Sequence, residues 1–510
     1  MKKNNGLRKI VIVGGGSAGW ISASCLAYSL QNTQCEITLV ESPDIGIIGV
    51  GEATIPSFVD FIQYLGLSKA DFIRETKATF KLGIKFYDWL EEGHEYWHQF
   101  GDVGVNIDHK PFYQHWLKSK FNGAEGNYTD YSPSVAMAQE NKFFIPSQKQ
   151  KSILSGSTYA LHFDAGLVAH FLAKHAKSLG VHHISDNVVN VRLGTDGHIT
   201  ELDLKEREEP LEGDFFIDCS GQRGVLISQA LRVPYVNWGK YLPVDRAIAV
   251  PTENQAPLKP YTESFALEHG WRWRIPLQHR AGNGYIYSSD YCDDEMARDV
   301  LLRNISGKPL AEPRLIKFQT GKRDKFWSKN CLSIGLSSGF LEPLESTSIY
   351  LAMKGILNFV QMLPSTECKS ETAAEYNRLM DMEYECIRDF IVLHYCASKR
   401  TDSEFWRMWQ KAQIPDTLKA KLNLFKSQGR LMRNDQDLFS HDSWYAVLAG
   451  MDVRPEAYDW TTDASNYDKA CGIMSKVRMT LQERVQELPS HEEFVEKICA
   501  RVPQSERALG

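Results

Sequence analysis

Hydrophobic and polar positions at the start of the chain predict a strand, a turn and a helix. Ile10 to Val13 are four consecutive apolar, β-branched residues, which is the composition of a buried strand. A helix is predicted over 20–30, and a second apolar strand is predicted over 36–40. This order of elements indicates a parallel sheet of the α/β class.

The same patterns continue through the chain and change in its last third. They predict a helix over 167–179, a hairpin of strands 188–193 and 199–204, and apolar strands over 215–218 and 331–335. Beyond Glu345 the apolar residues fall at helical spacing up to Pro364, and 371–397 is a longer helical stretch. We therefore expect two parts, a domain over 1–355 with an inserted β-sheet and a mainly helical subdomain over 356–510.

Three glycines follow the first strand at the spacing of a dinucleotide-binding turn. Gly14, Gly16 and Gly19, with Ser17 and Ala18 between them, match G-x-G-x-x-G. Gly14 permits the sharp bend, Gly16 lets the backbone approach a pyrophosphate, and Gly19 lets the helix pack closely on the strand. The beginning of the chain therefore predicts a Rossmann-like nucleotide-binding domain.

The same residues also spell the nucleophile elbow of an α/β-hydrolase, Gly15-x-Ser17-x-Gly19. An elbow serine normally follows several strands of its sheet, whereas only a short segment precedes this strand. Glu41 ends the second strand about 20 residues downstream, where a dinucleotide fold has the carboxylate that accepts hydrogen bonds from a ribose. These positions favour nucleotide binding over hydrolysis.

Two later strands also end in small residues. The strand ending at Asp218 is followed by Cys-Ser-Gly, and the strand that begins at Cys331 ends at Gly335. A glycine-rich loop over 46–56 contains Gly51-Glu52-Ala53, and its apolar residues distinguish it from a solvated surface loop. Several such segments suit an FAD bound along its length better than an NAD held at one motif, so Asp218, Gly335, Gly51, Glu52 and Ala53 are predicted cofactor-binding residues.

His94 to His98 match H-E-x-x-H, the zinc metalloprotease signature. Such a zinc site requires both histidines on one face of a helix. Gly93 and Gly101 bracket the segment too closely for a stable helix, and no third ligand follows at a family spacing. We therefore predict no metal here, and a zinc hydrolase is the alternative from another class of enzyme.

The segment 79–89 alternates like a strand for part of its length. On one strand Lys81 and Lys85 would share a face, and the pattern by itself favours both as solvated side chains. A lysine in a closed pocket would instead have a lowered pKa and become reactive. The pattern leaves both interpretations open.

The segment Trp271-Arg-Trp-Arg-Ile-Pro276 alternates without interruption. On a strand, Trp271, Trp273 and Ile275 would face one side, with the two arginines on the other. This pattern indicates a buried aromatic face. Residues 282–288 are interpreted as a turn and a strand.

Composition narrows the functional classes. The chain has 510 residues, of which 43% are hydrophobic, and its formal charge of −6 argues against a nucleic-acid or anionic-membrane surface. No apolar run approaches the roughly 18 residues of a membrane span. The ten cysteines are scattered without a C-x-x-C pair, which fits reduced thiols in a cytoplasmic protein.

Four segments together resemble the flavin-dependent tryptophan halogenase family over nearly the whole chain. They are the glycine turn 14–19, Phe80-Lys81, the segment 271–276, and Phe340-Leu-Glu-Pro-Leu-Glu345-Ser-Thr-Ser348. The glycine turn is shared by many flavoproteins, whereas W-x-W-x-I-P distinguishes these halogenases from flavin monooxygenases. Its coincidence with the Glu345 segment argues against a chance match.

The resemblance implies a two-component enzyme. FADH2 supplied by a separate flavin reductase, together with O2, oxidises bromide or chloride to hypohalous acid. Trp271, Trp273 and Pro276 would form a barrier that keeps the organic substrate away from the flavin. The oxidant would cross the protein to Lys81, which forms a haloamine or hydrogen-bonds hypohalous acid.

The Glu345 segment would supply the remaining catalytic groups. The resemblance implies that Glu345 stabilises the cationic ring intermediate and is the candidate to accept its proton. The backbone amides of Thr347 and Ser348 would hold the halide at a helix start. Ser348 replaces the usual glycine of the family, which constrains the backbone more and leaves the halide preference open.

The substrate pocket is implied by aromatic positions. His98 and Phe100 match residues that line this pocket in the family. Members that act on free tryptophan hold its amino-acid end with a Tyr-Tyr pair and a glutamate, where this chain has Trp444, Tyr445 and Met451. Losing that carboxylate favours indole or a related small aromatic as the substrate. The enzyme is expected to be a monomer or homodimer. An FAD-dependent aromatic monooxygenase is the alternative activity.

Overall fold

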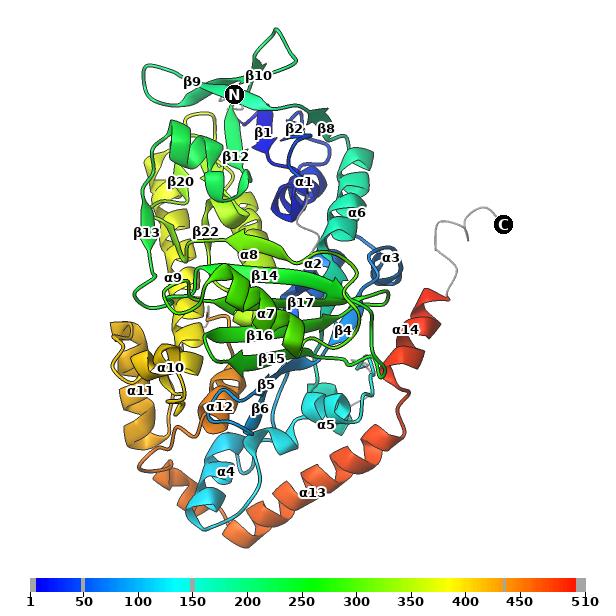
Figure 1. The fold of residues 1–510 in the computed structure, drawn as a ribbon, viewed down its shortest axis with the longest axis vertical. Helices are drawn as coiled ribbons and strands as arrows, with labels where there is room; N and C mark the ends of the chain where they lie inside the picture. Colours follow the sequence, from blue (N-terminus) through cyan, green and yellow to red (C-terminus); the bar gives the residue numbers. More distant parts are fainter. Residues whose placement is uncertain (1–5, 47–50, 147–151, 434–436, 501–510) are drawn as a thin grey trace.

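The computed structural model describes residues 6–46, 51–146, 152–433 and 437–500. Its upper part, as drawn in Figure 1, contains a six-stranded sheet in the order β20-β21-β12-β1-β2-β8. All neighbours in this sheet are parallel except β20 and β21. The strands are β1 (Lys9–Val13), β2 (Glu36–Glu41), β8 (His182–Ser185), β12 (Phe215–Asp218), β20 (Trp327–Ser328) and β21 (Cys331–Ser333).

The predicted Rossmann-like start of the chain is confirmed. β1 lies between β2 and β12 because its apolar residues are buried from both sides. The helix α1 (Ser17–Ser29) begins inside the glycine turn, three residues earlier than its apolar pattern predicted. It contacts α6 (Ala165–Ser178) and α8 (Ser348–Gln361), which cover this side of the sheet.

A seven-stranded sheet crosses the middle of the molecule in the order β18-β14-β17-β16-β15-β5-β6 (Figure 1). Its pairs are antiparallel except β15 with β5. The strands are β5 (Gly83–Tyr87), β6 (Glu95–Gln99), β14 (Arg246–Thr252), β15 (Thr262–Leu267), β16 (Gly270–Pro276), β17 (Ala281–Tyr287) and β18 (Arg314–Lys317).

One prediction in this sheet was wrong. Gly282 to Gly284 were interpreted as a turn, but they lie within β17. A Cβ at Gly284 would meet the indole ring of Trp273 at 2.0 Å, and a Cβ at Gly282 would meet the backbone of Gly51 at 3.1 Å. These glycines allow close packing across the sheet, a use that local pattern does not distinguish from a turn.

The segment 79–89 is two strands instead of one. It breaks at Leu82, so that β4 (Thr79–Lys81) belongs to a small sheet with β3 (Gly51–Ala53) and β7 (Ala160–Asp164), and β5 belongs to the large sheet. Lys81 and Lys85 therefore do not share a strand face. This break separates a fully buried lysine from one that forms an ion pair with Glu95 at the surface.

The remaining elements complete the fold. The hairpin of β9 and β10 has the predicted bounds. Two further three-stranded sheets consist of β9 (Val188–Leu193), β10 (Ile199–Leu204) and β11 (Leu211–Glu212), and of β13 (Tyr235–Asn237), β19 (Gly321–Arg323) and β22 (Gly339–Phe340). The other helices are α2 (Ser57–Tyr64), α3 (Lys69–Glu75), α4 (Phe112–Phe121), α5 (Pro133–Gln139), α7 (Asp294–Asn304), α9 (Ser370–Cys396), α10 (Glu404–Trp409), α11 (Asp416–Gln428), α12 (His441–Gly450), α13 (Tyr467–Gln486) and α14 (His491–Cys499).

The C-terminal part is helical, as predicted, but it is closely joined to the rest. The expected division at residue 355 falls inside α8. One cluster of buried apolar residues extends from Ile10 in β1 to Ile498 in α14. Helices α10 to α12 lie at the lower left of Figure 1, below α9, and α14 returns to contact α3 and β4.

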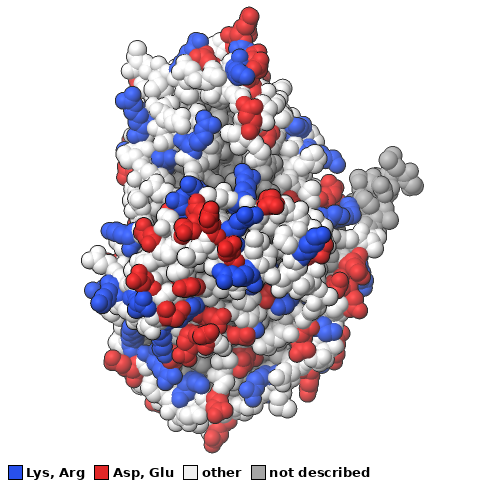
Figure 2. Space-filling model, in the orientation of Figure 1, with Lys and Arg blue, Asp and Glu red and all other residues white. Residues whose placement is uncertain are grey.

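The surface charge and the hydropathy of the helices match what composition predicted. Lysine and arginine are interspersed with aspartate and glutamate over the face shown in Figure 2, whose upper half is hollowed. Among the described residues, no helix has the length and apolar character needed to cross a membrane.

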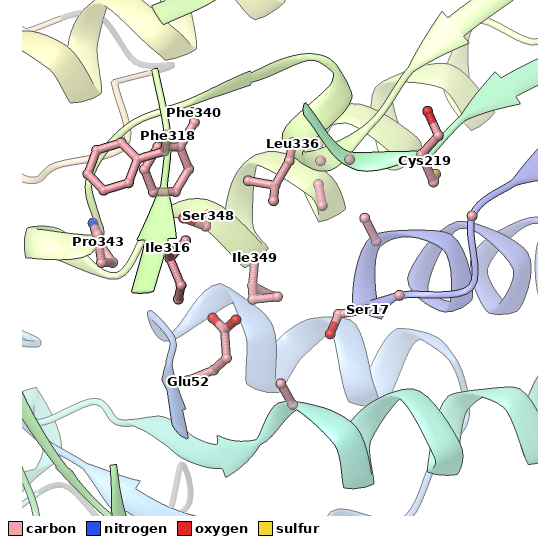
Figure 3. A pocket seen from close by; sticks show the side chains of 18 of the residues that line it. Ser17, Glu52, Cys219, Ile316, Phe318, Leu336, Phe340, Pro343, Ser348 and Ile349 are labelled. Carbon is pink, nitrogen blue, oxygen red and sulfur yellow. The ribbon is translucent and has the colours of Figure 1, made fainter. Parts of the chain in front are cut away.

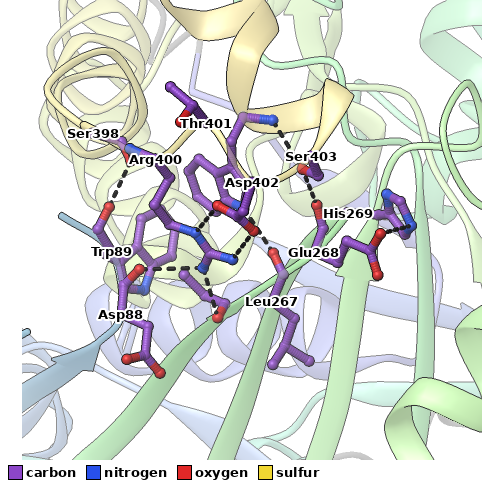
Figure 4. Close-up of polar contacts among 12 residues, drawn as sticks. Asp88, Trp89, Leu267, Glu268, His269, Ser398, Arg400, Thr401, Asp402 and Ser403 are labelled. Carbon is purple, nitrogen blue, oxygen red and sulfur yellow. Dashed lines mark hydrogen bonds and ion pairs between the residues drawn. The ribbon is translucent and has the colours of Figure 1, made fainter. Parts of the chain in front are cut away.

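Arg400 fastens the segment after α9 to the large sheet (Figure 4). Its guanidinium donates to the carbonyls of Asp88 at 3.2 Å and Ala266 at 3.0 Å and pairs with Asp402 at 2.6 Å. Ser398 and Ser403 donate to other carbonyls of the same strand ends. This network fixes the end of α9 relative to β5 and β15.

We expect Arg400→Ala to lower the free energy of unfolding by about 1–3 kcal/mol, because two carbonyls lose their donor inside the protein. Thermal denaturation measures the loss. Arg407→Ala, in the exposed part of the same segment, should shift the melting temperature far less. Equal effects of the two substitutions would contradict this role for Arg400.

Candidate active site

A cavity of about 700 Å³ runs along the carboxyl ends of the parallel strands. It begins at the glycine turn after β1 and extends between β16 and the start of α8 (Figure 3). Its volume is in the range of cofactor sites, and the carboxyl edge of a parallel sheet is where such folds bind nucleotides.

The glycine turn has the geometry predicted for it. Gly14 has φ +120°, and a Cβ there would meet the carbonyl oxygen of Cys219 at 2.2 Å. A Cβ at Gly19 would lie 1.8 Å from the carbonyl oxygen of Gly14, whereas a Cβ at Gly16 would meet no atom within 4 Å. The turn is therefore tightly packed on the protein side and open on the cavity side, where Ser17 and Ala18 also line it.

Of the residues predicted at the other strand ends, Glu41 and Gly335 line the cavity and Asp218 does not. Glu41 lines it, and its carboxylate lies 3.0 Å from His183 Nε2. Gly335 lines it with φ +73°, and a Cβ there would clash with Ala18 at 2.6 Å. Asp218 does not face the cavity: its buried carboxylate accepts hydrogen bonds from the backbone of Ser220, Leu226 and Ile227, so this predicted residue supports the turn instead of reaching a ligand.

Gly51, Glu52 and Ala53 line the cavity from β3 and form a strand, not the predicted loop. Residues 47–50 of that loop lie outside the described residues. Figure 3 shows the Glu52 carboxylate projecting into the cavity. Burial raises the pKa of Glu52 to about 7.

These residues fit the predicted FAD. The open backbone at Gly16 and the start of α1 suit a pyrophosphate, and Lys205 and Arg223 bring positive charge to the cavity wall. Glu41 ends β2 and lines the cavity, the position from which the carboxylate of a dinucleotide fold would accept hydrogen bonds from a ribose. The apolar far end, near Trp271, suits a flat ring system.

The tryptophan strand closes that far end. Trp271, Trp273 and Ile275 line the cavity, and Arg274 on the opposite face pairs with Glu263 at 2.8 Å, so the predicted alternation is confirmed. Trp271 donates from Nε1 to the buried carboxylate of Glu342 at 2.5 Å. Pro276 is absent from the cavity wall, and its carbonyl accepts from Thr79 at 2.6 Å, next to β4.

Lys81 is fully buried and does not line the cavity, but it contacts Ser346, which does. Its Nζ donates to the carbonyl of Thr54 at 3.0 Å and to Ser346 Oγ at 2.7 Å, and lies 5.1 Å from the centre of the Phe100 ring. Burial lowers the pKa of Lys81 from 10.5 to about 7, and the charge of Glu345 limits the fall. The solvated interpretation of Lys81 is therefore wrong: Lys81 is the last residue of β4, whose three residues are all buried, and β4 pairs with β7 in the interior.

This buried charge has a consequence for stability. The unfolded chain keeps the lysine proton up to about pH 10.5, whereas the folded chain loses it above about pH 7, so the wild type gains stability as pH rises through that window. Relative to Lys81→Met, we expect the wild type to gain about 2–3 kcal/mol between about pH 6 and pH 9. Urea denaturation at the two pH values measures it, and a pH-independent difference would contradict the lowered pKa.

Glu345 lies between two histidines in the interior. His98 Nδ1 is 2.6 Å from Oε2, and His394 Nε2 is 2.8 Å from Oε1. Burial alone would raise the pKa of Glu345, but His98 and His394 outweigh it and lower the pKa to about 2. The carboxylate is therefore ionised and held in one orientation.

Aromatic rings surround His98. Phe390 lies 5.2 Å and Phe100 lies 6.2 Å from it, centre to centre, and Trp444 packs edge-on against Phe390 at 4.9 Å. Tyr445 lies apart from this group, stacked on Tyr113 at 3.7 Å. The structure thus brings three of the four predicted substrate residues, His98, Phe100 and Trp444, into one cluster.

Thr347 and Ser348 lie where α8 begins, and Ser348 lines the cavity. Ser348 is absent from the residues with positive φ, which include Ser346 at φ +60° instead. The backbone freedom of a glycine is thus not needed at Ser348. The free N–H groups and the dipole of the first helical turn make this position suitable for an anion.

The structure lacks the geometry that two alternative interpretations of the sequence require, the zinc site at His94 and His98 and the nucleophile elbow at Ser17. His98 lies in β6, an extended strand, so the H-E-x-x-H segment does not present two histidines on a helix face. Ser17 lines the cavity, but no hydrogen bond joins its side chain to a histidine in the described part of the chain.

Sequence reasoning missed several residues that complete the site. Thr54 and Ser346 bind Lys81, His394 binds Glu345, and Glu342 binds Trp271. The signal for His394 was a histidine in the apolar run 390–395, and the signal for Glu342 was a second glutamate three residues before Glu345. Neither pattern indicates a partner without the tertiary structure.

Comparison with known proteins decides the family. The family model for tryptophan halogenase matches residues 9–467. The chain belongs to the tryptophan halogenase family. The tryptophan 6-halogenase SttH of Streptomyces toxytricini is 34% identical over 526 aligned positions, covering 97% of this chain and 99% of SttH.

Solved structures agree with this membership. BrvH, a flavin-dependent halogenase from Brevundimonas sp. BAL3, superimposes with a TM-score of 0.93 at 39% identity, covering 97% of this chain and all of BrvH. Xcc4156, a flavin-dependent halogenase from Xanthomonas campestris, gives a TM-score of 0.93 at 39% identity, covering 98% of this chain and 100% of Xcc4156. The protein is accordingly a flavin-dependent halogenase, an enzyme class that uses a reduced flavin, O2 and halide.

Proposed function

We propose that this halogenase brominates or chlorinates indole or a related electron-rich aromatic, with FADH2 bound in the cavity and hypohalous acid delivered to Lys81. The bound cofactor would supply the oxidising equivalent that converts halide into an electrophile. Residues 1–355 would hold the cofactor, and residues 356–510 would complete the substrate pocket through Phe390, His394 and Trp444.

The observation that carries the proposal is the position of Lys81. The cavity reaches Ser346, whose Oγ is 2.7 Å from the buried Lys81 Nζ. The proposed path of the oxidant from the cavity to the lysine would pass Ser346, and Trp271 and Trp273 would keep the organic substrate away from the cofactor. A desolvated lysine with a pKa near 7 can act as a hydrogen-bond donor or as a nucleophile.

The start of α8 would hold the halide. The amides of Thr347 and Ser348 follow Ser346 directly, and Ser346 and Ser348 line the cavity, so an anion held there would lie next to the residue that contacts Lys81. Placement at a helix N-terminus supports this assignment.

The substrate is proposed to lack an amino-acid group. Met451, at the position where the family resemblance places a carboxylate, is buried and apolar. The aromatic cluster of His98, Phe100, Phe390 and Trp444 would hold a flat, electron-rich ring near Lys81 and set the halogenated carbon by geometry.

A separate flavin reductase is the proposed partner, and the halogenase would act as a monomer or homodimer. The two-component character of the family supports the reductase. Positive and negative side chains are mixed on the face shown in Figure 2, which argues against a nucleic-acid partner.

Mass spectrometry of an aromatic panel tests the proposal. The enzyme is incubated with FAD, NADH, a flavin reductase and bromide or chloride, and products are searched for halogen isotope patterns. A monohalogenated indole is expected. A hydroxylated product that forms without halide would identify a monooxygenase instead, and halogenation of free tryptophan in preference to indole would overturn the proposed substrate.

A further inference from the structure

Four buried side chains form a row of close contacts that includes Glu345, whose charge acts on Lys81. Tyr96 Oη lies 2.6 Å from His394 Nδ1, His394 Nε2 lies 2.8 Å from Glu345 Oε1, and Glu345 Oε2 lies 2.6 Å from His98 Nδ1. Each of the four is 5% exposed or less. The row starts on β6, crosses α9 and the Glu345 turn, and returns to β6 at His98.

The hydrogen positions in this row follow from its chemistry. Burial raises the pKa of Tyr96 well above 10, so its hydroxyl keeps the hydrogen and donates to His394 Nδ1. Burial lowers the pKa of His394, so the neutral ring carries its single hydrogen on Nε2. That nitrogen lies 2.8 Å from Glu345 Oε1, a close contact without hydrogen-bond geometry. Because the ionised Glu345 can only accept, His98 must carry a hydrogen on Nδ1.

One basic nitrogen at the end of the row is unused. His98 Nε2 is buried, and no hydrogen-bond partner for it exists among the described residues. Its ring is walled by Phe390, Phe439 and Phe100, which offer no polar atom. A buried acceptor without a partner costs free energy, so a ligand that interacts with Nε2 is favoured.

We propose that His98 is the base that takes the proton from the halogenated ring carbon, and that Glu345 serves as its orienting carboxylate. This assignment rests on the proposed function and deepens it. It moves the proton acceptor from Glu345 to His98, to which the family resemblance assigned only a place in the pocket wall.

The step balances as follows. The ring carbon forms its bond to the halogen of hypohalous acid, whose oxygen leaves as hydroxide. The C–H bond of that carbon then breaks, its electron pair restores the aromatic ring, and the proton moves to His98 Nε2. The imidazolium is stabilised by Glu345 at 2.6 Å, and its proton later neutralises the hydroxide to water.

The contacts of the two side chains favour His98 over Glu345 as the base. Both oxygens of Glu345 already face histidine nitrogens, at 2.6 and 2.8 Å. His98 Nε2, in contrast, has no hydrogen-bond partner among the described residues. A carboxylate that fixes the tautomer of a histidine while the other ring nitrogen takes the proton is an established catalytic arrangement.

The decisive variant is His98→Asn. The asparagine amide can still donate to Glu345 but has no basic nitrogen. Single-turnover halogenation of indole and of ring-deuterated indole is measured with reduced FAD, O2 and bromide. We expect the wild type to show no primary isotope effect, and His98→Asn to be slower by about 10²–10⁴-fold with a primary isotope effect.

Controls separate this role from a structural one. His94→Asn, the other histidine of the same segment, should keep the wild-type rate, and flavin fluorescence reports whether each variant binds FAD. Imidazole in the buffer should restore part of the rate of His98→Gly. A wild-type rate in His98→Asn, or a slow rate without an isotope effect, would overturn the assignment.

A readout without turnover distinguishes failure of this inference from failure of the proposed function. A wild type that makes no haloindole overturns the proposed function alone. The state of His98 is then read by ¹⁵N NMR of histidine-labelled protein. A hydrogen on Nδ1 with Nε2 unprotonated supports the inference, and a hydrogen on Nε2 of the neutral ring overturns it.

Discussion

Lys81→Ala is expected to abolish halogenation, a loss of at least about 10³-fold, because it removes the amine that contacts Ser346 and would receive the oxidant. FAD binding should persist, since Lys81 does not line the cavity. Formation of peroxide from NADH and O2 in the presence of the reductase should persist for the same reason. Product analysis and a peroxide assay measure the two outcomes.

The matched control for this substitution is Lys85→Ala. Lys85 lies four residues further along the same segment but forms an ion pair with Glu95 at the surface. It should leave the rate close to that of the wild type. Halogenation retained by Lys81→Ala would contradict the proposed delivery of hypohalous acid to Lys81.

Glu345→Gln should slow halogenation by about 10²–10³-fold, the usual cost of removing one preorganised electrostatic group. The amide would present a donor to one of two histidine nitrogens that also donate, and the negative charge between His98 and His394 would disappear. Single-turnover product formation with reduced FAD measures the effect.

Glu345→Asp separates charge from position. It keeps the carboxylate but withdraws it by one methylene, so its loss should be smaller than that of Glu345→Gln. Equal rates in Glu345→Gln and the wild type would remove Glu345 from the mechanism, whereas an equal loss in both variants would show that distance to the histidines matters more than charge.

The nucleotide-binding half of the molecule was predictable because its signals are local. The glycine spacing, the apolar strand before it and the small residues at later strand ends depend on backbone conformation and on neighbours within one βαβ unit. The structure shifts these elements by a few residues and turns Asp218 inward, where four backbone and side-chain donors around residues 220–227 satisfy it.

For the catalytic site, the sequence could predict individual residues but not how they lie relative to one another. Periodicity favoured a solvated Lys81 without excluding a buried one, and in the structure Lys81 is fully buried in β4, before the break at Leu82. Glu345, His98 and His394 come from a turn, a strand and a helix far apart in the chain. No spacing rule connects them, so their mutual distances could not be inferred from any one segment.

The sequence by itself therefore determined the Rossmann-like beginning, the alternating tryptophan strand, the helical C-terminal third and, by resemblance, the family. The tertiary structure decided which lysine is buried, which histidines hold Glu345 and which nitrogen of His98 is left without a partner. The physical reason is that strands and turns follow from local conformational preference, whereas desolvation and pairing of charged groups depend on what long-range packing places around them.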